Sequence, residues 1–169
     1  MRFIRLTDRS RKSVEAAWEE ARMLGHDSVG DEDLLLGILR ADEGIGASAL
    51  SSLGVTLEEA RETSEGMLSD ALASIGVSLE EVRQEAGDAF EMRIHPGRRL
   101  PLSPRGKKAL VGARKEMRRL GDDYLGTEHV LLGILGNEDG TAIRMLAGMN
   151  VSPETVEDRL YQLRGRAAG

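Results

Sequence analysis

The stretch LGHDSVGDEDLLLGIL at residues 24–39 recurs further along the chain as LGDDYLGTEHVLLGIL at residues 120–135. The same register extends without a gap over residues 7–61 and 103–157, where 19 of the 55 aligned positions are identical. Agreement over so long a stretch at one fixed offset is the signature of an internal duplication. The chain is therefore expected to contain two copies of one structural unit, the first and second repeat.

Each repeat is predicted to form four helices, because apolar residues recur at helical spacing between glycines and prolines that mark helix ends and turns. Thr7 and Ser103 are suitable N-caps for the first helix. Asp31 and Thr127 are the expected N-caps of the second helix, which is apolar enough to be central. The third helices are expected near residues 45–53 and 141–149, and the fourth begin after Thr56 and Ser152.

A shorter duplication lies between the repeats. The sequence ALSSLGVTLEEAR at residues 49–61 resembles ALASIGVSLEEVR at residues 71–83, with nine of 13 positions identical. It predicts an added helix pair from about Asp70 to Glu91. The following linker is a basic, proline-containing segment, interpreted either as solvated chain or as a contact for an acidic partner. The predicted order is the first repeat at 1–66, the inserted helix pair at 67–91, the linker at 92–102, the second repeat at 103–164 and a flexible tail at 165–169.

Composition excludes several classes of function. The 29 acidic residues outnumber the 23 basic ones, giving a net charge of −6, which argues against nucleic-acid binding. The chain has no cysteine, so disulfides and thiolate chemistry are excluded. There is no apolar stretch long enough to span a membrane and no signal-peptide pattern, so a cytoplasmic protein is expected.

Motifs for catalysis are absent from the sequence. There is no phosphate-binding G-x-x-x-x-G-K-[ST] motif and no nucleophile elbow. The three histidines, His26, His95 and His129, show no metal-ligand spacing. We therefore expect a binding module rather than an enzyme, with no cofactor and no metal.

Three separated motifs resemble those of Clp N-terminal domains, especially of the ClpC type. They are FIRLTDRSR at residues 3–11, LSPRGKKAL at residues 102–110 and GTEHVLLGIL at residues 126–135. The resemblance implies an all-α domain of two pseudo-twofold-related repeats. It also implies capture of protein substrates or adaptors for a Clp-type unfolding ATPase, although the ATPase motif itself is missing here. Whether the chain is free-standing or part of a longer protein stays open.

The resemblance also implies a ligand. In ClpC-type domains each repeat holds a pocket for phosphorylated arginine, in which an acidic residue binds the guanidinium and helix N-terminal groups receive the phosphate. Carried across, the acids are Glu32 and Glu128, with Asp31 and Thr127 beside them. Carboxylates bind guanidinium groups in a bidentate manner, and helix N-termini attract anions. Acidic residues in a first helical turn also stabilise a helix without any ligand.

The two predicted pockets differ in charge. The first repeat has Asp31-Glu32-Asp33 where the second has Thr127-Glu128-His129. The additional acid would repel a phosphate group. We therefore expect the first pocket to bind phosphoarginine more weakly, or to prefer an unmodified cationic group.

Phe3 is an unusual aromatic residue near the N-terminus of a chain that has few aromatics. It is expected either to pack over the first repeat or to line an apolar groove for peptides. Similar grooves in related domains accept small cyclic peptides. This resemblance implies an alternative function, a free-standing decoy that sequesters such compounds.

Overall fold

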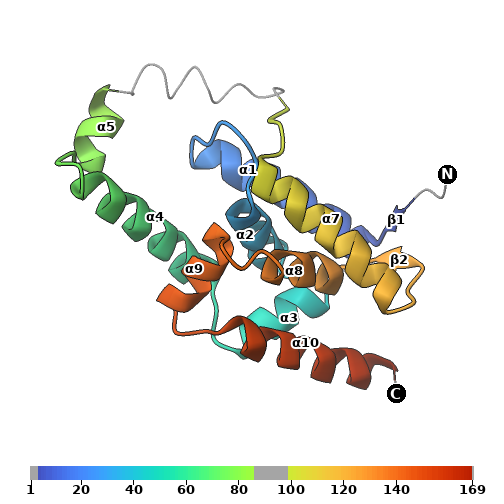
Figure 1. Ribbon diagram of the computed structural model, residues 1–169. Coiled ribbons are helices and arrows are strands. Elements are labelled where there is room, and N and C mark those ends of the chain that lie inside the picture. Colours follow the sequence, from blue (N-terminus) through green and yellow to red (C-terminus); the bar gives the residue numbers. More distant parts are fainter. Residues whose placement is uncertain (1–3, 86–98, 169) are drawn as a thin grey trace.

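The computed structural model describes residues 4–85 and 99–168, and over these it contains nine helices and two very short strands (Figure 1). The expected all-α class is confirmed. No helix within the described residues is both long and apolar enough to cross a membrane.

Each repeat consists of four helices, as predicted. The N-caps predicted for the first helix are confirmed, because the Thr7 hydroxyl accepts from the Ser10 N–H at 3.1 Å and the Ser103 hydroxyl from the Gly106 N–H at 3.0 Å. The first repeat contains β1 (Arg5–Leu6), α1 (Asp8–Met23), α2 (Asp31–Ala41), α3 (Ile45–Ser52) and α4 (Leu57–Ala73). Helix α5 (Leu79–Glu85) follows, and the second repeat contains α7 (Pro104–Arg119), β2 (Tyr124–Leu125), α8 (Thr127–Leu135), α9 (Thr141–Gly148) and α10 (Pro153–Ala168).

Two glycines permit the close packing of the first and second helix in each repeat. A Cβ atom on Gly37 of α2 would overlap the backbone of Ser13 in α1, and one on Gly133 of α8 would overlap that of Ala109 in α7. Because neither glycine has a side chain, the helix backbones approach closely. Helices α2 and α8 are thereby placed in the centre, and most of their side chains are buried.

The repeats interlock rather than lie apart. Helix α4 of the first repeat packs on α9 of the second, and α10 of the second packs on α3 of the first (Figure 1). Strand β1 pairs in parallel with β2, with Arg5 opposite Tyr124. The pseudo-equivalent pairing on the other side is a single parallel bridge between Val29 and Leu102. One continuous hydrophobic core results.

Each repeat also caps a helix of the other. Helices α3 and α9 begin after Gly44 and Gly140, which have no side chain to act as a cap. The Thr127 hydroxyl accepts a hydrogen bond from the Gly46 N–H of α3 at 3.0 Å. Asp31 Oδ2 accepts one from the N–H of Ala142, in α9, at 3.1 Å. The two bonds are pseudo-equivalent and connect the repeats through their buried polar groups.

The predicted role of Asp31 and Thr127 as N-caps of their own helices is therefore wrong. Helices α2 and α8 begin at these residues, and their N-caps are Gly30 and Gly126. At the first helical position the side chain lies one residue beyond the N-cap of its own helix. It can then cap a neighbouring helix instead.

The segment between the repeats differs in part from expectation. Helix α4 is continuous to Ala73, so the boundary expected at 66/67 falls inside a helix. Helix α5 starts with a reciprocal capping box, in which Ser78 and Glu81 each accept the other's N–H at 3.1 Å. Residues 86–98, which include most of the predicted linker, lie outside the described residues.

Residues 165–168, where a flexible tail was expected, belong to α10, which continues to Ala168. Alanine and arginine are good helix formers, and Arg166 in the last turn interacts favourably with the helix dipole. These effects outweigh the single helix-weakening Gly165.

The exchanged caps predict a large effect of a small substitution. Thr127→Val keeps the shape of the side chain but leaves the Gly46 N–H buried without an acceptor, which costs about 1–3 kcal/mol. Urea unfolding should show this loss. Thr63→Val is the control, because Thr63 lies within α4 and caps no helix N-terminus. Equal stability of the two variants would contradict the structural role assigned to Thr127.

Candidate functional site

Glu32 and Glu128 are pseudo-equivalent and occupy the second position of α2 and α8. Each side chain folds back over the glycine that precedes its helix. A Cβ atom on Gly30 would overlap the Glu32 carboxylate, and one on Gly126 would overlap that of Glu128. The carboxylates therefore lie at the helix N-termini, in space that the missing glycine side chains leave free.

The third residue of each helix closes the N-terminus. Asp33 Oδ2 accepts a hydrogen bond from the Gly30 N–H at 2.9 Å. In the second repeat, His129 Nδ1 accepts one from the Gly126 N–H at the same distance. A carboxylate and an imidazole thus perform the same capping function at equivalent positions.

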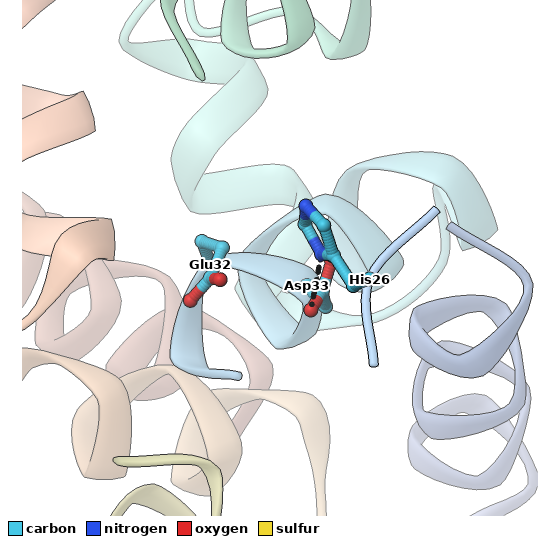
Figure 2. Close-up of side chains that lie close together, drawn as sticks. All are labelled: His26, Glu32 and Asp33. Carbon is cyan, nitrogen blue, oxygen red and sulfur yellow. Dashed lines mark hydrogen bonds and ion pairs between the residues drawn. The ribbon is translucent and has the colours of Figure 1, made fainter. Parts of the chain in front are cut away.

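The capping residues belong to a histidine–aspartate pair whose members are exchanged between the repeats. His26 Nδ1 lies 2.9 Å from Asp33 Oδ1, and Figure 2 shows the two side chains facing each other. At the equivalent positions, Asp122 Oδ2 lies 2.7 Å from His129 Nε2. Because His129 Nδ1 accepts the Gly126 N–H, its proton must reside on Nε2, which donates to Asp122. Both repeats therefore contain a histidine–aspartate pair, but the histidine and the aspartate occupy exchanged positions.

The first site is strongly acidic. Burial, the charge of Asp33 and a hydrogen bond with Asp31, in that order of importance, together raise the pKa of Glu32 to about 7. A protonated Glu32 can donate to Asp31, whose Oδ1 is buried without another partner. The pKa of His26 is raised by its hydrogen bond to Asp33.

The second site contains a compensating cation. Arg164 of α10 binds Asp122 through both terminal guanidinium nitrogens, with Nη2 lying 2.8 Å from Oδ1. This contact, followed by the hydrogen bond from His129, lowers the pKa of Asp122. Glu128 is 17% exposed at the side chain. The two sites therefore share a backbone arrangement but differ in charge.

Each site is assembled from both repeats. The Leu125 carbonyl, just before Gly126, accepts from the Thr7 N–H at 3.1 Å and from the Ser10 hydroxyl at 2.6 Å. The N-terminus of α1 thus lies beside the segment leading to Glu128. In the same way, Ser103 at the start of α7 donates its N–H to the Val29 carbonyl at 2.9 Å, beside the segment leading to Glu32.

The family comparison agrees with this two-repeat architecture. The profile of the family "Clp repeat (R) N-terminal domain" matches residues 5–69, 62–149 and 102–167. The chain belongs to the Clp N-terminal domain family. In this family the domain is a non-catalytic module of Clp chaperones.

Curated relatives support the same assignment. The chain is 35% identical to "Chaperone protein ClpB" of Oceanobacillus iheyensis over 98% of its length. It is 34% identical to "Negative regulator of genetic competence ClpC/MecB" of Bacillus subtilis, again over 98% of its length. In both comparisons it spans only 18% of the relative.

Solved structures confirm the fold. The N-terminal domain of the chaperone ClpD from Arabidopsis thaliana superposes with a TM-score of 0.69 at 22% identity, covering 100% of this chain and 98% of that one. The Hsp104 N-terminal domain from Candida albicans gives a TM-score of 0.64 at 14% identity, covering 95% and 92%. The predicted Clp fold is therefore confirmed.

Within this Clp domain, His26, Glu32 and Asp33 form a cluster that could offer a metal ion three ligand atoms within 4.8 Å of one another (Figure 2). Asp33 already accepts hydrogen bonds from His26 and Gly30. A proton on His26 Nδ1 is what makes its contact with Asp33 favourable. Hydrogen bonding inside the cluster therefore accounts for its arrangement without a metal ion.

The predicted site residues of the Clp domain occupy different environments. Glu32 and Glu128 are partly exposed at helix N-termini, whereas Asp31 and Thr127 are 0% and 1% exposed and serve as the exchanged caps. Phe3 lies outside the described residues. Sequence reasoning missed His26, Asp122 and Arg164 as site residues. The exchange of histidine and aspartate was visible at the 96-residue offset, but Arg164 lies beyond the aligned repeat.

The raised pKa of Glu32 predicts a pH-dependent stability difference. The folded-state pKa of about 7 lies above the ordinary value of 4.5, so the folded protein holds a proton that the unfolded chain releases. This contribution to stability is lost as the pH rises through 7. Glu32→Gln should therefore become more stable relative to the parent protein as the pH increases, by on the order of 1–3 kcal/mol at pH 8.

Urea unfolding of both proteins at pH 5 and pH 8 measures this change. Glu59→Gln, at an exposed residue of α4, corrects for the general effect of removing one negative charge. A Glu32→Gln difference that is the same at both pH values would show that the Glu32 proton is not linked to folding.

Proposed function

We propose that this domain captures protein substrates or adaptors for a Clp-type ATPase, and that the Glu128 site recognises phosphorylated arginine. The observation that carries the proposal is the partly exposed Glu128 carboxylate, held at one helix N-terminus and beside the N-terminus of a second helix. A carboxylate and helix N-terminal N–H groups are complementary to the two halves of a phosphoarginine side chain.

Glu128 supplies the group for the guanidinium. Its carboxylate is directed back over Gly126 by the first turn of α8. Arginine presents a planar array of donors that a carboxylate can bind through two parallel hydrogen bonds. Partial burial strengthens such bonds because less water competes for them.

Helix α1 supplies donors for the phosphate. The first N–H groups of a helix have no acceptor within the helix, and the Thr7 hydroxyl accepts only that of Ser10. Those of Asp8 and Arg9 are therefore suited to an anion. The charge of Asp8 is offset by Arg11, whose Nη1 lies 3.9 Å away.

The Glu32 site is less suitable for the same ligand. It faces the N-terminus of α7, where Pro104 has no N–H to donate. It also contains Asp33 in place of His129, and Glu32 itself has a pKa near 7. These features support the expectation that phosphoarginine binds more weakly in the first repeat.

The sequence does not contain the ATPase motif that the proposed function requires of a partner. The chain spans less than a fifth of the curated relatives it matches. We propose that the domain supplies capture, while an ATPase supplies the energy for unfolding. The alternative decoy function was inferred from Phe3, which is not among the described residues. No feature of the described residues favours that function.

Calorimetric titration with free phosphoarginine tests the proposal. We expect saturable binding that weakens about 10- to 100-fold in Glu128→Gln, because a charge-assisted pair is lost. Glu32→Gln should change the affinity much less, and unmodified arginine serves as the control ligand. Binding that survives Glu128→Gln but disappears in Glu32→Gln would overturn the assignment of the stronger site.

A second prediction leaves the net charge unchanged. Gly126→Ala introduces a methyl group into the position of the Glu128 carboxylate, so the carboxylate must move. Phosphoarginine affinity should fall nearly as much as in Glu128→Gln. Gly66→Ala is the matched control, because a Cβ atom at Gly66 meets open space. Unchanged binding by Gly126→Ala would show that this carboxylate position is not used.

A further inference from the structure

A separate cavity of about 440 Å³ lies in the second repeat, away from the sites of Glu32 and Glu128. It lies between α7, the end of α8, and the beginnings of α9 and α10. Its lining includes four carboxylates and several apolar side chains but no basic side chain. The residues that matter for its chemistry are Glu116, Glu138, Glu154, Glu157, Leu132 and Ile143.

The equivalent location in the first repeat is filled. Glu20, equivalent to Glu116, is 0% exposed and binds two arginines. Arg40 Nη1 donates to its Oε1 at 3.1 Å, and Arg61 Nε donates to its Oε2 at 3.0 Å. The first repeat thus satisfies its buried carboxylate with guanidinium groups from its own chain.

The second repeat lacks both arginines. Arg40 corresponds to Gly136, and Arg61 corresponds to Glu157. Both replacements line the cavity. One removes a long side chain and the other reverses its charge, so the second repeat has an open acidic cavity where the first has an internal ion cluster.

Glu116 retains one partner in the folded domain. Arg119, in the same helix, lies 2.7 Å from its Oε2, and the Arg119 side chain is 54% exposed. Glu20 shows that a carboxylate at this position can bind two guanidinium groups together. Glu116 therefore has the capacity to accept a second one.

We propose that this cavity binds an unmodified arginine side chain of a partner polypeptide. Its guanidinium takes the place occupied by Arg61 in the first repeat, between Glu116 and Glu157. Its aliphatic portion lies against Leu132 and Ile143, which provide the apolar contact that such stems favour. The four carboxylates repel a phosphate group, so the ligand differs from that of the Glu128 site.

This inference goes beyond the proposed phosphoarginine function and does not depend on it. The test uses the peptide acetyl-Leu-Arg-Leu-amide and the same peptide with citrulline, which retains the shape of arginine but carries no charge. Calorimetry should show saturable binding of the arginine peptide and at least tenfold weaker binding of the citrulline peptide. Equal affinities, or no binding of either peptide, would overturn the proposal.

The substitution Glu157→Arg is designed to recreate the arrangement of the first repeat, in which Arg61, at the equivalent position, binds the Glu20 carboxylate. We expect it to abolish peptide binding while the thermal unfolding midpoint is maintained or raised. Glu62→Arg, an equal charge change on an exposed part of α4, is the matched control and should bind like the parent protein apart from a small general charge effect. Binding by Glu157→Arg as tight as that of Glu62→Arg would overturn the proposal.

A competition experiment separates this site from the phosphoarginine site. Amide chemical shifts of Ile143 and Glu157 should move when the arginine peptide is added, and an excess of free phosphoarginine should not reverse them. Displacement of the peptide by phosphoarginine would place both ligands at one site and contradict a distinct arginine pocket.

Discussion

Helices α3 and α9 begin after glycines that cannot cap them, and the other repeat provides the missing hydrogen-bond acceptors. The two capping side chains fit only because these positions are glycines. A Cβ atom on Gly44 would overlap Thr127, and one on Gly140 would overlap Asp31. A repeat folded alone would leave its third helix without this cap. The exchange therefore makes the two repeats one cooperative unit, in addition to the shared hydrophobic core.

The same constraint positions the candidate sites. Successive helical residues point about 100° apart, so the three residues at each helix start face different surroundings. The first is buried and caps the other repeat, the second reaches the surface, and the third closes its own helix. Fixing the first residue in the interior thereby fixes the direction of Glu32 or Glu128. A change in the interior cap would move the carboxylate at the surface.

The sequence was sufficient to predict those features that depend on neighbouring residues. The duplication, the four helices of each repeat, and the capping by Thr7 and Ser103 are confirmed. The role of Asp31 could not be predicted in this way, because its partner Ala142 lies 111 residues away along the chain. Local rules assign a capping residue to the nearest helix. Only the packed structure shows that the nearest helix in space belongs to the other repeat.

Duplication allows one backbone arrangement to carry different charges in its two copies. The main-chain donors at the starts of α2 and α8 are fixed by the helices, whereas the charges around them are free to change. Asp122 binds Arg164, whereas the equivalent His26 lies beside acidic groups that raise its pKa. At the position of Glu20 it is the first repeat that supplies the compensating cations, Arg40 and Arg61. One repeat satisfies a carboxylate internally, and the absence of those arginines in its copy leaves a cavity of matching chemistry. In a duplicated domain, an internal contact in one copy therefore indicates which kind of external group the other copy can receive.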